Sequence, residues 1–381
     1  MNKDSLQIKK GSSCANEPVQ AVNELYQAIY QPNISLAIFY CSPDYNLQQL
    51  ASALQARFAG INLIGCTTAG EITPVGYLNG SITGVSLAAK DFTAISMRID
   101  DLQHFKISQG QILTNELLAR LTALCKLPNK NKSFAFLLID GLSVKEEIVV
   151  SVLYNALEGI PLFGGSAADG VNFKQTLIYH DGAFHRDCAL LTLVYTEYPF
   201  TIFKTEHFSG SEKKAVITAA KPEQRLVQEI NGAPAALEYA DLIGVNVAEL
   251  GPTIYAMYPL VIKVGGHYYV RSIMAANEDN SLTFSSAINE GLVVTVATLG
   301  DLVANLAQLF DRIHNDIGEP ALILGCDCIL RQKEIEEKGL FPLVSDIMCK
   351  NNVIGFSTYG EQLNAMHINQ TFTGVAIGKG I

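Results

Sequence analysis

Leu63-Ile-Gly-Cys-Thr-Thr-Ala-Gly-Glu71 is the first of three copies of one short motif, and this repeat decides the fold. The second copy is Leu162-Phe-Gly-Gly-Ser-Ala-Ala-Asp-Gly170, and the third is Val353-Ile-Gly-Phe-Ser-Thr-Tyr-Gly-Glu361. Each copy has two apolar residues, a glycine, one variable residue and then Ser or Thr. A repeat of this kind indicates that one structural unit recurs along the chain.

The segments around the motif are repeated as well. An apolar run stands before each copy, and the three runs are Leu36–Cys41, Phe134–Ile139 and Ala321–Leu324. A turn signal and a stretch with helical periodicity follow the first two runs, and a longer stretch that contains Pro342 follows the third. Similar strands, Ile82–Leu87 and Phe372–Ile377, come after the first and third copies. We therefore expect a module of strand, turn, helix, strand, Gly-x-Ser/Thr loop and further strand.

This module predicts the fold class. Fully apolar strands joined by helices indicate mixed sheets that are covered by helices. The region of about 200–320 has shorter alternating segments, with strands expected at His267–Arg271 and Leu282–Phe284 and a short helix at Glu223–Ile230. We predict a flexible N-terminal tail (1–20), an α/β domain (21–198) and an α+β domain (199–381).

The Gly-x-Ser/Thr loops are the candidate ligand site. Right-handed crossovers place each loop at the carboxyl end of its strand, where ligands bind in open α/β sheets. Glycine lets a backbone approach a ligand, and Ser or Thr offers a hydroxyl group. The candidate ligand-binding residues are Gly65, Cys66, Thr67, Gly164, Gly165, Ser166, Gly355, Ser357 and Thr358. The alternative is that the loops are only tight turns, and the sequence does not say whether they share one cavity.

Composition limits the possible partners. The chain carries 27 Lys and Arg against 37 Asp and Glu, a net charge of −10 without a basic cluster. This charge argues against nucleic acid and against an anionic membrane surface. No apolar run reaches the roughly 18 residues of a membrane span, and the N-terminus lacks a secretory signal. The eight dispersed cysteines indicate reduced cytoplasmic thiols, and we interpret Cys326-Asp-Cys328 as strand-end thiols rather than metal ligands.

The chain resembles FIST proteins, in which an N-terminal FIST region is followed by a C-terminal one. Besides the motif copies, the resemblance rests on Asp181-Gly182, Asn231–Ala235, Tyr269–Ser272 and Asn369–Thr371. It implies a cytoplasmic sensory protein that binds a small ligand, presumed to be an amino acid, and that is not an enzyme. The chain ends at Ile381, soon after the last motif, so we expect it to signal through a separate partner.

A smaller group of stand-alone FIST proteins looks like nitric-oxide sensors that carry haem. The resemblance to this group implies haem b as cofactor and a histidine kinase or a cyclic-di-GMP enzyme as partner in a two-component system. It leaves a homodimer open.

That group draws attention to a histidine hairpin. Asp181-Gly182 between alternating apolar residues predicts a two-residue turn, in which Ile178 pairs with His185 and His180 with Ala183. His180 and His185 then share one face. A haem iron needs a neutral imidazole and an apolar wall, so we expect His180 to be the metal ligand and His185 a second cofactor-binding residue. The alternative is that both are solvated surface histidines.

Enzyme signatures are missing from the sequence. It contains no Gly-x-Ser-x-Gly elbow, Walker loop or His-Glu-x-x-His motif. Cys66, next to Thr67, is a candidate nucleophile without a placed base. Glu146-Glu147 lies at a predicted helix start, where negative charge is favoured, and His367 lies between two segments that match the family. An enzyme that uses Cys66 and an interaction scaffold with empty loops are the alternatives to a sensor.

Overall fold

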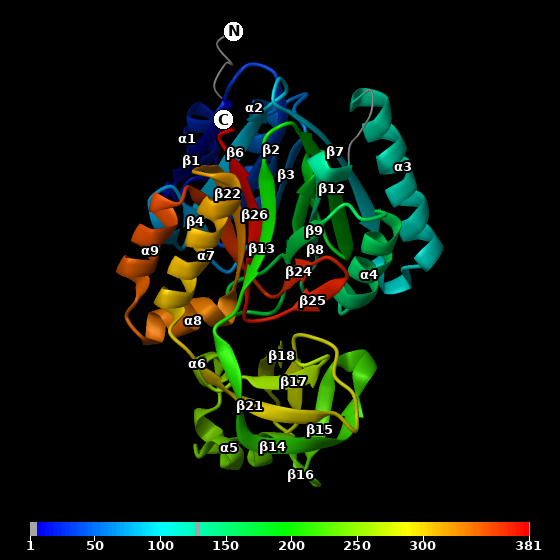
Figure 1. The fold of residues 1–381 in the computed structure, drawn as a ribbon, viewed down its shortest axis with the longest axis vertical. Helices are drawn as coiled ribbons and strands as arrows, with labels where there is room; N and C mark the ends of the chain where they lie inside the picture. The colour runs from blue at the N-terminus through cyan, green and yellow to red at the C-terminus, as the bar shows by residue number, and fades with distance from the viewer. Residues whose placement is uncertain (1–5, 126–129, 381) are drawn as a thin grey trace.

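The structure, a computed structural model, describes residues 6–125 and 130–380. It has two parts, which Figure 1 shows one above the other. The larger part is a ring of three modules, and the smaller part is an inserted unit (residues 206–301) that lies against one end of the ring.

Each module of the ring runs strand, helix, strand, helix, strand, hairpin and strand. The first consists of β1 (Ile8–Ser13), α1 (Pro18–Ile29), β2 (Ile34–Cys41), α2 (Leu47–Arg57), β3 (Leu63–Thr67), β4 (Glu71–Thr73), β5 (Gly76–Leu78) and β6 (Ile82–Ala88). The second consists of β7 (Phe92–Asp100), η1 (Leu102–His104), α3 (Ile107–Cys125), η2 (Lys130–Lys132), β8 (Ser133–Ile139), α4 (Glu146–Ala156), β9 (Leu162–Ser166), β10 (Ile178–His180), β11 (Ala183–His185) and β12 (Cys188–Thr196). The third consists of β13 (Phe200–Thr205), α7 (Leu302–Ile317), β22 (Pro320–Cys328), α8 (Ile329–Glu337), α9 (Phe341–Lys350), β23 (Val353–Thr358), β24 (Glu361–Leu363), β25 (Met366–Ile368) and β26 (Phe372–Gly378).

The three modules exchange their hairpins in a closed cycle. The sheet orders are β1-β6-β2-β3-β10-β11, β7-β12-β8-β9-β24-β25 and β13-β26-β22-β23-β4-β5. Each sheet therefore takes four strands from one module and a hairpin from another. The pairs β2–β3, β8–β9 and β22–β23 are parallel, and their neighbours are antiparallel. This equivalence gives the ring an approximate threefold symmetry.

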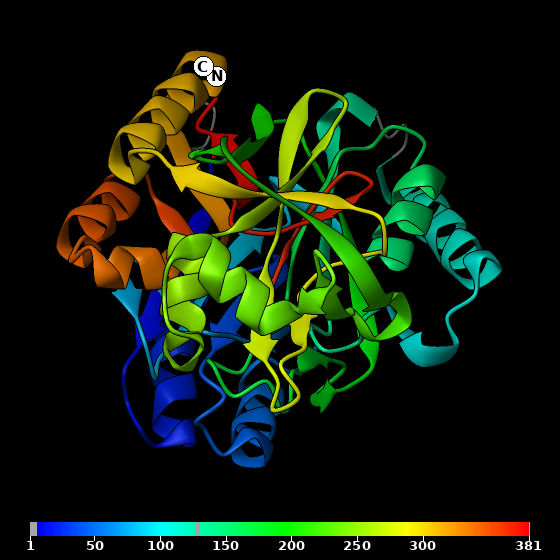
Figure 2. The same cartoon turned by 90° about the horizontal axis from the view of Figure 1, so that it is seen from below.

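The core of the ring lies between the inner faces of the three sheets. Alternating residues of β2 show how the faces divide: Ile38 and Tyr40 join this shared core, whereas Ala37 and Phe39 pack under α1 and α2. The Tyr40 ring stacks on Phe356 of the third module, with centroids 4.6 Å apart. Figure 2 shows the blue, cyan-to-green and orange helix groups at three corners, so helices cover the outer faces.

Local sequence signals explain where several helices begin. The Glu17 side chain accepts hydrogen bonds from two backbone N–H groups of the first turn of α1, and Asp301 does the same for α7. Pro342 lies in the first turn of α9, where its missing N–H needs no partner. The longer stretch before the third motif copy is therefore two helices.

The inserted unit interrupts the third module between β13 and α7. Its elements are β14 (Phe208–Lys221), η3 (Pro222–Gln224), β15 (Leu226–Ile230), β16 (Ala233–Pro234), α5 (Ala235–Ile243), η4 (Val247–Glu249), α6 (Pro252–Met257), β17 (Leu260–Val264), β18 (His267–Arg271), β19 (Ile273–Ala276), β20 (Leu282–Phe284) and β21 (Val293–Leu299). They build an eight-stranded sheet with its own apolar core. The Gly300 N–H donates to the His207 carbonyl at 2.5 Å, so the chain enters and leaves the unit at adjacent points.

The predicted mixed sheets covered by helices, built from repeated strand-helix-strand modules, are confirmed. Two local expectations are corrected. Glu223–Ile230 is not a helix, because residues 226–230 pair with β14 and β20. Residues 8–13 are not a tail, because they form β1 along β6, while residues 1–5 lie outside the described part. The expected boundary near residue 198 lies between β12 and β13, and the exchanged hairpins β4–β5 and β24–β25 cross it.

Candidate functional site

The three Gly-x-Ser/Thr loops meet at the end of the ring that the inserted unit covers. Backbone hydrogen bonds of 2.9 Å join them in pairs, from Ala69 N–H to the Ser357 carbonyl, from Ala168 N–H to the Thr67 carbonyl and from Ser166 N–H to the Gly360 carbonyl. Loop residues Ala168 and Tyr359 belong to the apolar core of the inserted unit. The loops therefore form one platform under that unit.

The glycines that open the motifs serve strand packing. A Cβ atom on Gly65, Gly164 or Gly355 would collide with a backbone carbonyl oxygen of the adjacent parallel strand. Gly165 is equally confined, because its Cβ would lie 2.6 Å from the Phe356 ring. These glycines admit a neighbouring strand, and none of them lines the cleft or the hairpin cavity described below.

The hydroxyl groups of the motifs hold the platform together. Thr67 Oγ1 accepts from Leu177 N–H at 3.0 Å, Ser166 Oγ accepts from Gln362 at 3.0 Å, and Thr358 Oγ1 donates to the Ser166 carbonyl at 2.7 Å. The Ser357 Oγ atom is buried and has no hydrogen-bond partner within the described residues. The Cys66 side chain points into the shared core, and burial raises the pKa of its thiol well above the ordinary value. Cys66 is thus neither exposed nor ionised as a nucleophile must be.

A cleft of about 290 Å³ opens directly beside these residues. All three modules contribute to its walls, which consist of Ser42, Pro43, Asp44, Thr68, Ala69, Gly70, Glu71, Asn79, Gly80, Asp169, Gly170, Val171, Asn172, Ile329, Gln332, Lys333, Glu336 and Phe341. The predicted residues of the first two copies lie one to five positions before residues that line the cleft, whereas no residue of the third loop lines it. The cleft therefore opens at the carboxyl ends of the motif strands, and its lining comes from neighbouring loop residues and from α8.

Glu71 lies at the buried base of the cleft. Its carboxylate accepts hydrogen bonds from Thr68 Oγ1 at 2.5 Å and from the Ser81 hydroxyl at 2.7 Å. Burial raises the pKa of Glu71 from its ordinary 4.5 to about 7, although these hydrogen bonds act in the opposite direction. At neutral pH the base of the cleft can therefore hold or release a proton.

The upper walls are polar, and backbone geometry shapes them. Gly70 has a φ angle of +147°, and a Cβ there would lie 2.7 Å from the Gln332 amide and 2.8 Å from the Asn79 amide oxygen, so this position requires glycine. Asp169 accepts three backbone N–H bonds from residues 173–175 and one from the Tyr359 hydroxyl, which fixes the opposite wall. Lys333 forms an ion pair with Glu336 at 2.8 Å on the α8 side.

The histidine hairpin has the predicted register. Ile178 pairs with His185, and His180 pairs with Ala183, so both imidazoles belong to one face. The His185 Nε2 atom lies 3.0 Å from the His180 carbonyl, and the His180 Nδ1 atom lies 3.1 Å from Asp181 without hydrogen-bond geometry. A separate cavity of about 380 Å³ lies between the hairpin tip and the end of α2.

A haem requires an apolar wall around its iron ligand. Burial lowers the pKa of His180, which keeps the imidazole neutral, but the groups whose charges act on it are Asp181, Arg98, His185 and Asp100. The hairpin thus offers an imidazole in charged surroundings. Leu54, Phe58 and Leu63 line the cavity beside His180, so it is the charged groups that fit a haem ligand poorly.

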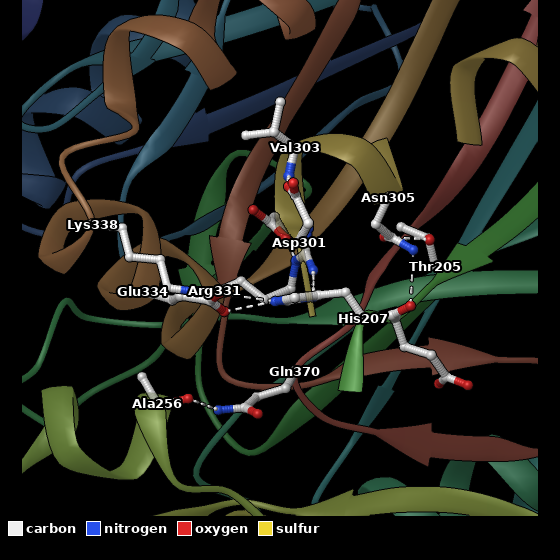
Figure 3. Close-up of polar contacts among 12 residues, drawn as sticks. Thr205, His207, Ala256, Asp301, Val303, Asn305, Arg331, Glu334, Lys338 and Gln370 are labelled. Carbon is white, nitrogen blue, oxygen red and sulfur yellow. Dashed lines mark hydrogen bonds and ion pairs between the residues drawn. The ribbon is translucent and has the colours of Figure 1, made fainter. Parts of the chain in front are cut away.

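A buried charge network ties the inserted unit to the third module (Figure 3). Arg331 donates from Nε to Asp327 at 2.7 Å, its Nη1 lies 2.9 Å from His207 Nδ1, and His207 Nε2 lies 2.8 Å from Glu334. Burial lowers the pKa of His207. The spacing of Asp327 and Arg331, four residues apart at a helix start, is a sequence signal that could have indicated this pair.

A second buried ion pair joins the inserted unit to the second module. The Arg225 guanidinium donates to Glu146 and to Glu147, each at 2.5 Å. The two carboxylates at the start of α4 therefore have a specific partner, Arg225, which the sequence pattern alone does not show. Cys326 and Cys328 are buried free thiols in β22, and the described residues hold no cluster of His, Cys, Asp and Glu suited to a metal ion.

Comparison with known proteins agrees with the fold. The profile of the FIST N domain matches residues 35–233, and the profile of the FIST C domain matches residues 235–364. An uncharacterized protein of Methanocaldococcus jannaschii is 24% identical over 389 residues, covering 90% of this chain and 73% of that protein. Within residues 6–125 and 130–380, no helix is long and apolar enough to cross a membrane. The match to the FIST N profile spans more than half of this chain, so the chain belongs to the FIST family.

Proposed function

We propose that this protein is a cytoplasmic receptor that binds a small polar ligand in the cleft beside the platform and reports its presence to a signalling partner. FIST domains are associated with small-ligand sensing in signal transduction and are not catalytic domains. The observation that carries the proposal is the cleft itself, because all three modules line it. A volume of about 290 Å³ is at the lower end of ligand pockets and suits a molecule of amino-acid size.

The groups in the cleft support a ligand with both donors and acceptors. The Gln332 and Asn79 amides, which are 3.4 Å apart, can each accept and donate a hydrogen bond. Asp44 is exposed at the mouth beside an ST-type turn made by Ser42, and it can attract an ammonium group. An amino acid is therefore the ligand class that we propose first.

The proposed partner is a histidine kinase or a cyclic-di-GMP enzyme, acting as a separate protein. The inserted unit supports a route for the signal, because loop residues that neighbour the cleft also pack into its core. A ligand that changes how the platform packs would shift the preferred position of the inserted unit.

Thermal unfolding in the presence of a panel of amino acids tests this proposal. A ligand at about 100 times its Kd stabilises the folded state by about 2.7 kcal/mol, which is measurable as a rise in Tm. We expect Gln332→Ala to lose the rise, since it removes a cleft side chain. Glu337→Ala, an exposed position on the same helix outside the cleft, should retain it. Equal responses of both variants, or no response of the wild type, would remove the cleft as the site.

Haem with nitric-oxide sensing is the alternative that the stand-alone family members suggest. The charged surroundings of His180 count against it. We expect haem-supplied protein to show no Soret band that depends on His180. A band that is present in the wild type and lost in both His180→Ala and His185→Ala would restore haem as the ligand.

A further inference from the structure

Three carboxylates line the cleft beside the platform without an ion-pair partner among the described residues. They are Asp44 at the mouth, Glu71 at the base and Asp169 in the opposite wall. Asp44 accepts a hydrogen bond from the Ser42 hydroxyl at 3.1 Å, and the other two accept hydroxyl and backbone N–H groups. These donors are neutral, so they orient the carboxylates without balancing their charge.

The basic group of the lining is already paired. Lys333 is the basic residue among those that line the cleft, and its Nζ atom lies 2.8 Å from a carboxylate oxygen of Glu336. Glu336 lines the cleft as well, so this pair adds no net charge to it. The lining is therefore negative, through Asp44, Asp169 and, when it is ionised, Glu71.

The carboxylates at the mouth and at the base are close enough to affect each other. Burial is the main cause of the raised pKa of Glu71, and the negative charge of Asp44 adds to it. Like charges that face one cavity repel each other, and a bound cation relieves that repulsion. A cleft with these groups attracts a cation and repels an anion.

A buried hydrogen-bond acceptor in the same cleft gives independent support for a ligand. The Gln332 side chain of α8 lines the cleft and is only 6% exposed. Its Nε2 atom donates to the Asn79 amide oxygen at 3.4 Å, whereas its Oε1 atom accepts no hydrogen bond within the described residues. Buried amide oxygens normally have a donor. An ammonium group has three N–H donors and can supply one.

We propose that the cleft selects a ligand of net positive charge, with a primary ammonium group that Asp44 balances and that oxygen atoms of the lining accept. This inference rests on the proposed function and narrows its ligand class to amino acids with a basic side chain or to diamines of similar length. Both carry an ammonium group on a flexible alkyl chain. An acidic amino acid would bring a further carboxylate beside Asp44 and Asp169, which makes it the poorest ligand.

Glu71 makes this selection depend on pH. Its carboxyl group is mostly neutral below its pKa of about 7 and adds a negative charge at the base of the cleft above it. A cationic ligand should therefore bind more tightly as pH rises through about 7. A ligand without net charge should change less, because its attraction to the added charge is smaller.

Thermal unfolding and calorimetric titration of the full chain with L-lysine, cadaverine and L-norleucine test the charge preference. Norleucine has the length of lysine but ends in a methyl group, and cadaverine is lysine without its carboxylate. At about pH 8 and equal ionic strength, where Glu71 is mostly ionised, we expect lysine and cadaverine to raise the Tm more than norleucine does. The tighter binder of the two cations shows whether the ligand is an amino acid or a diamine.

Three substitutions locate the effect. Asp44→Asn should weaken lysine binding by about two- to fivefold, the range of an exposed ion pair, and should change norleucine binding little. Glu71→Gln should remove the gain in lysine affinity between about pH 6 and pH 8. Glu337→Gln removes an exposed carboxylate of α8 outside the cleft and should bind lysine as the wild type does. This control separates the cleft from the general attraction of cations to a chain with a net charge of −10.

Two results would overturn the charge preference. One is norleucine binding as tight as that of both cations, and the other is an Asp44→Asn variant that binds lysine as tightly as Glu337→Gln does. If norleucine binds and Gln332→Ala loses it, the cleft stands as the site while the preference for a cation fails. If no probe binds in a way that depends on Gln332, the proposed function fails, and this inference fails with it.

Discussion

The carboxyl groups that end the motif copies differ among the three modules. Glu71 and Glu361 end the first and third motif copies, and each accepts hydrogen bonds from a hydroxyl-bearing residue ten positions later, Ser81 or Thr371. Burial raises the pKa of both, to about 7 for Glu71 and well above the ordinary value for Glu361. The second copy has Gly170 at the corresponding position, so the approximate symmetry does not extend to the ionisable groups.

Glu71 should make the stability of the protein depend on pH. Its folded pKa of about 7 exceeds the ordinary 4.5, so between these values the folded state holds a proton that the unfolded state has lost. Stability therefore falls as pH rises through this window, by about 3 kcal/mol relative to Glu71→Gln, which cannot ionise. Urea denaturation of both proteins at a series of pH values measures the difference. If the free energies of unfolding of the two proteins change with pH in the same way, Glu71 is not the group that causes the pH dependence.

Arg331 should be among the most sensitive residues. Among the described residues, Arg331→Met leaves the buried Asp327 carboxylate with the Tyr77 hydroxyl, at 2.6 Å, as its side-chain partner. Loss of one member of a buried ion pair costs about 3–5 kcal/mol in the free energy of unfolding. Lys350→Met, which removes an exposed ion pair with Asp346, should cost less than about 1 kcal/mol. Chemical denaturation compares the two, and similar losses would contradict the importance of the buried network.

At the scale of strands and helices, the modules were predictable, whereas the packing role of the motif glycines was not. Apolar runs such as Phe134–Ile139 reveal strands because both faces of the sheet are covered, and that information is local. The motif glycines are required because a neighbouring strand passes too close for a Cβ. Sequence spacing cannot distinguish a glycine that admits a ligand from one that admits a strand. The cleft residues Gln332 and Asn79 carry no repeat signal at all.

The packing role of these glycines can be tested at Gly164. In Gly164→Ala the new methyl group would meet the Leu137 carbonyl, so the parallel strands β8 and β9 must separate. Overpacking of this kind costs about 1–3 kcal/mol. Gly251→Ala adds a methyl group where no heavy atom lies within 4 Å, and it should stay within about 0.5 kcal/mol of the wild type. Equal unfolding midpoints for the two variants would refute the packing explanation.

At the scale of the whole molecule, buried polar contacts with two modules hold the inserted unit on the platform. Arg225 binds Glu146 of the second module, and His207 binds Glu334 of the third. Neither pair could be predicted, because each joins residues more than 70 positions apart. The hairpin exchange was also unpredictable. Strands as short as Glu71–Thr73 carry too few residues to reveal which strand they pair with.

Arg225→Met should loosen this attachment. It leaves Glu146, which is 1% exposed, without its cationic partner, and we expect a loss of about 3–5 kcal/mol in stability. Hydrogen exchange should become faster in residues 206–301 and around the start of α4, while β2 and β8 in the ring core change less. Arg120→Met, at an exposed pair on α3, serves as control. Uniformly faster exchange throughout the ring would contradict a local attachment.

The hairpin exchange has a consequence for folding during synthesis on the ribosome. β4, which ends at Thr73, pairs with β23, which begins at Val353, about 280 residues later. At translation rates of about 5–20 residues per second, the first hairpin waits roughly 15–60 s for its partner. During that time the edge of the β4–β5 hairpin is unpaired and open to other chains. We therefore expect the nascent first module to depend on chaperones until the third module has been made.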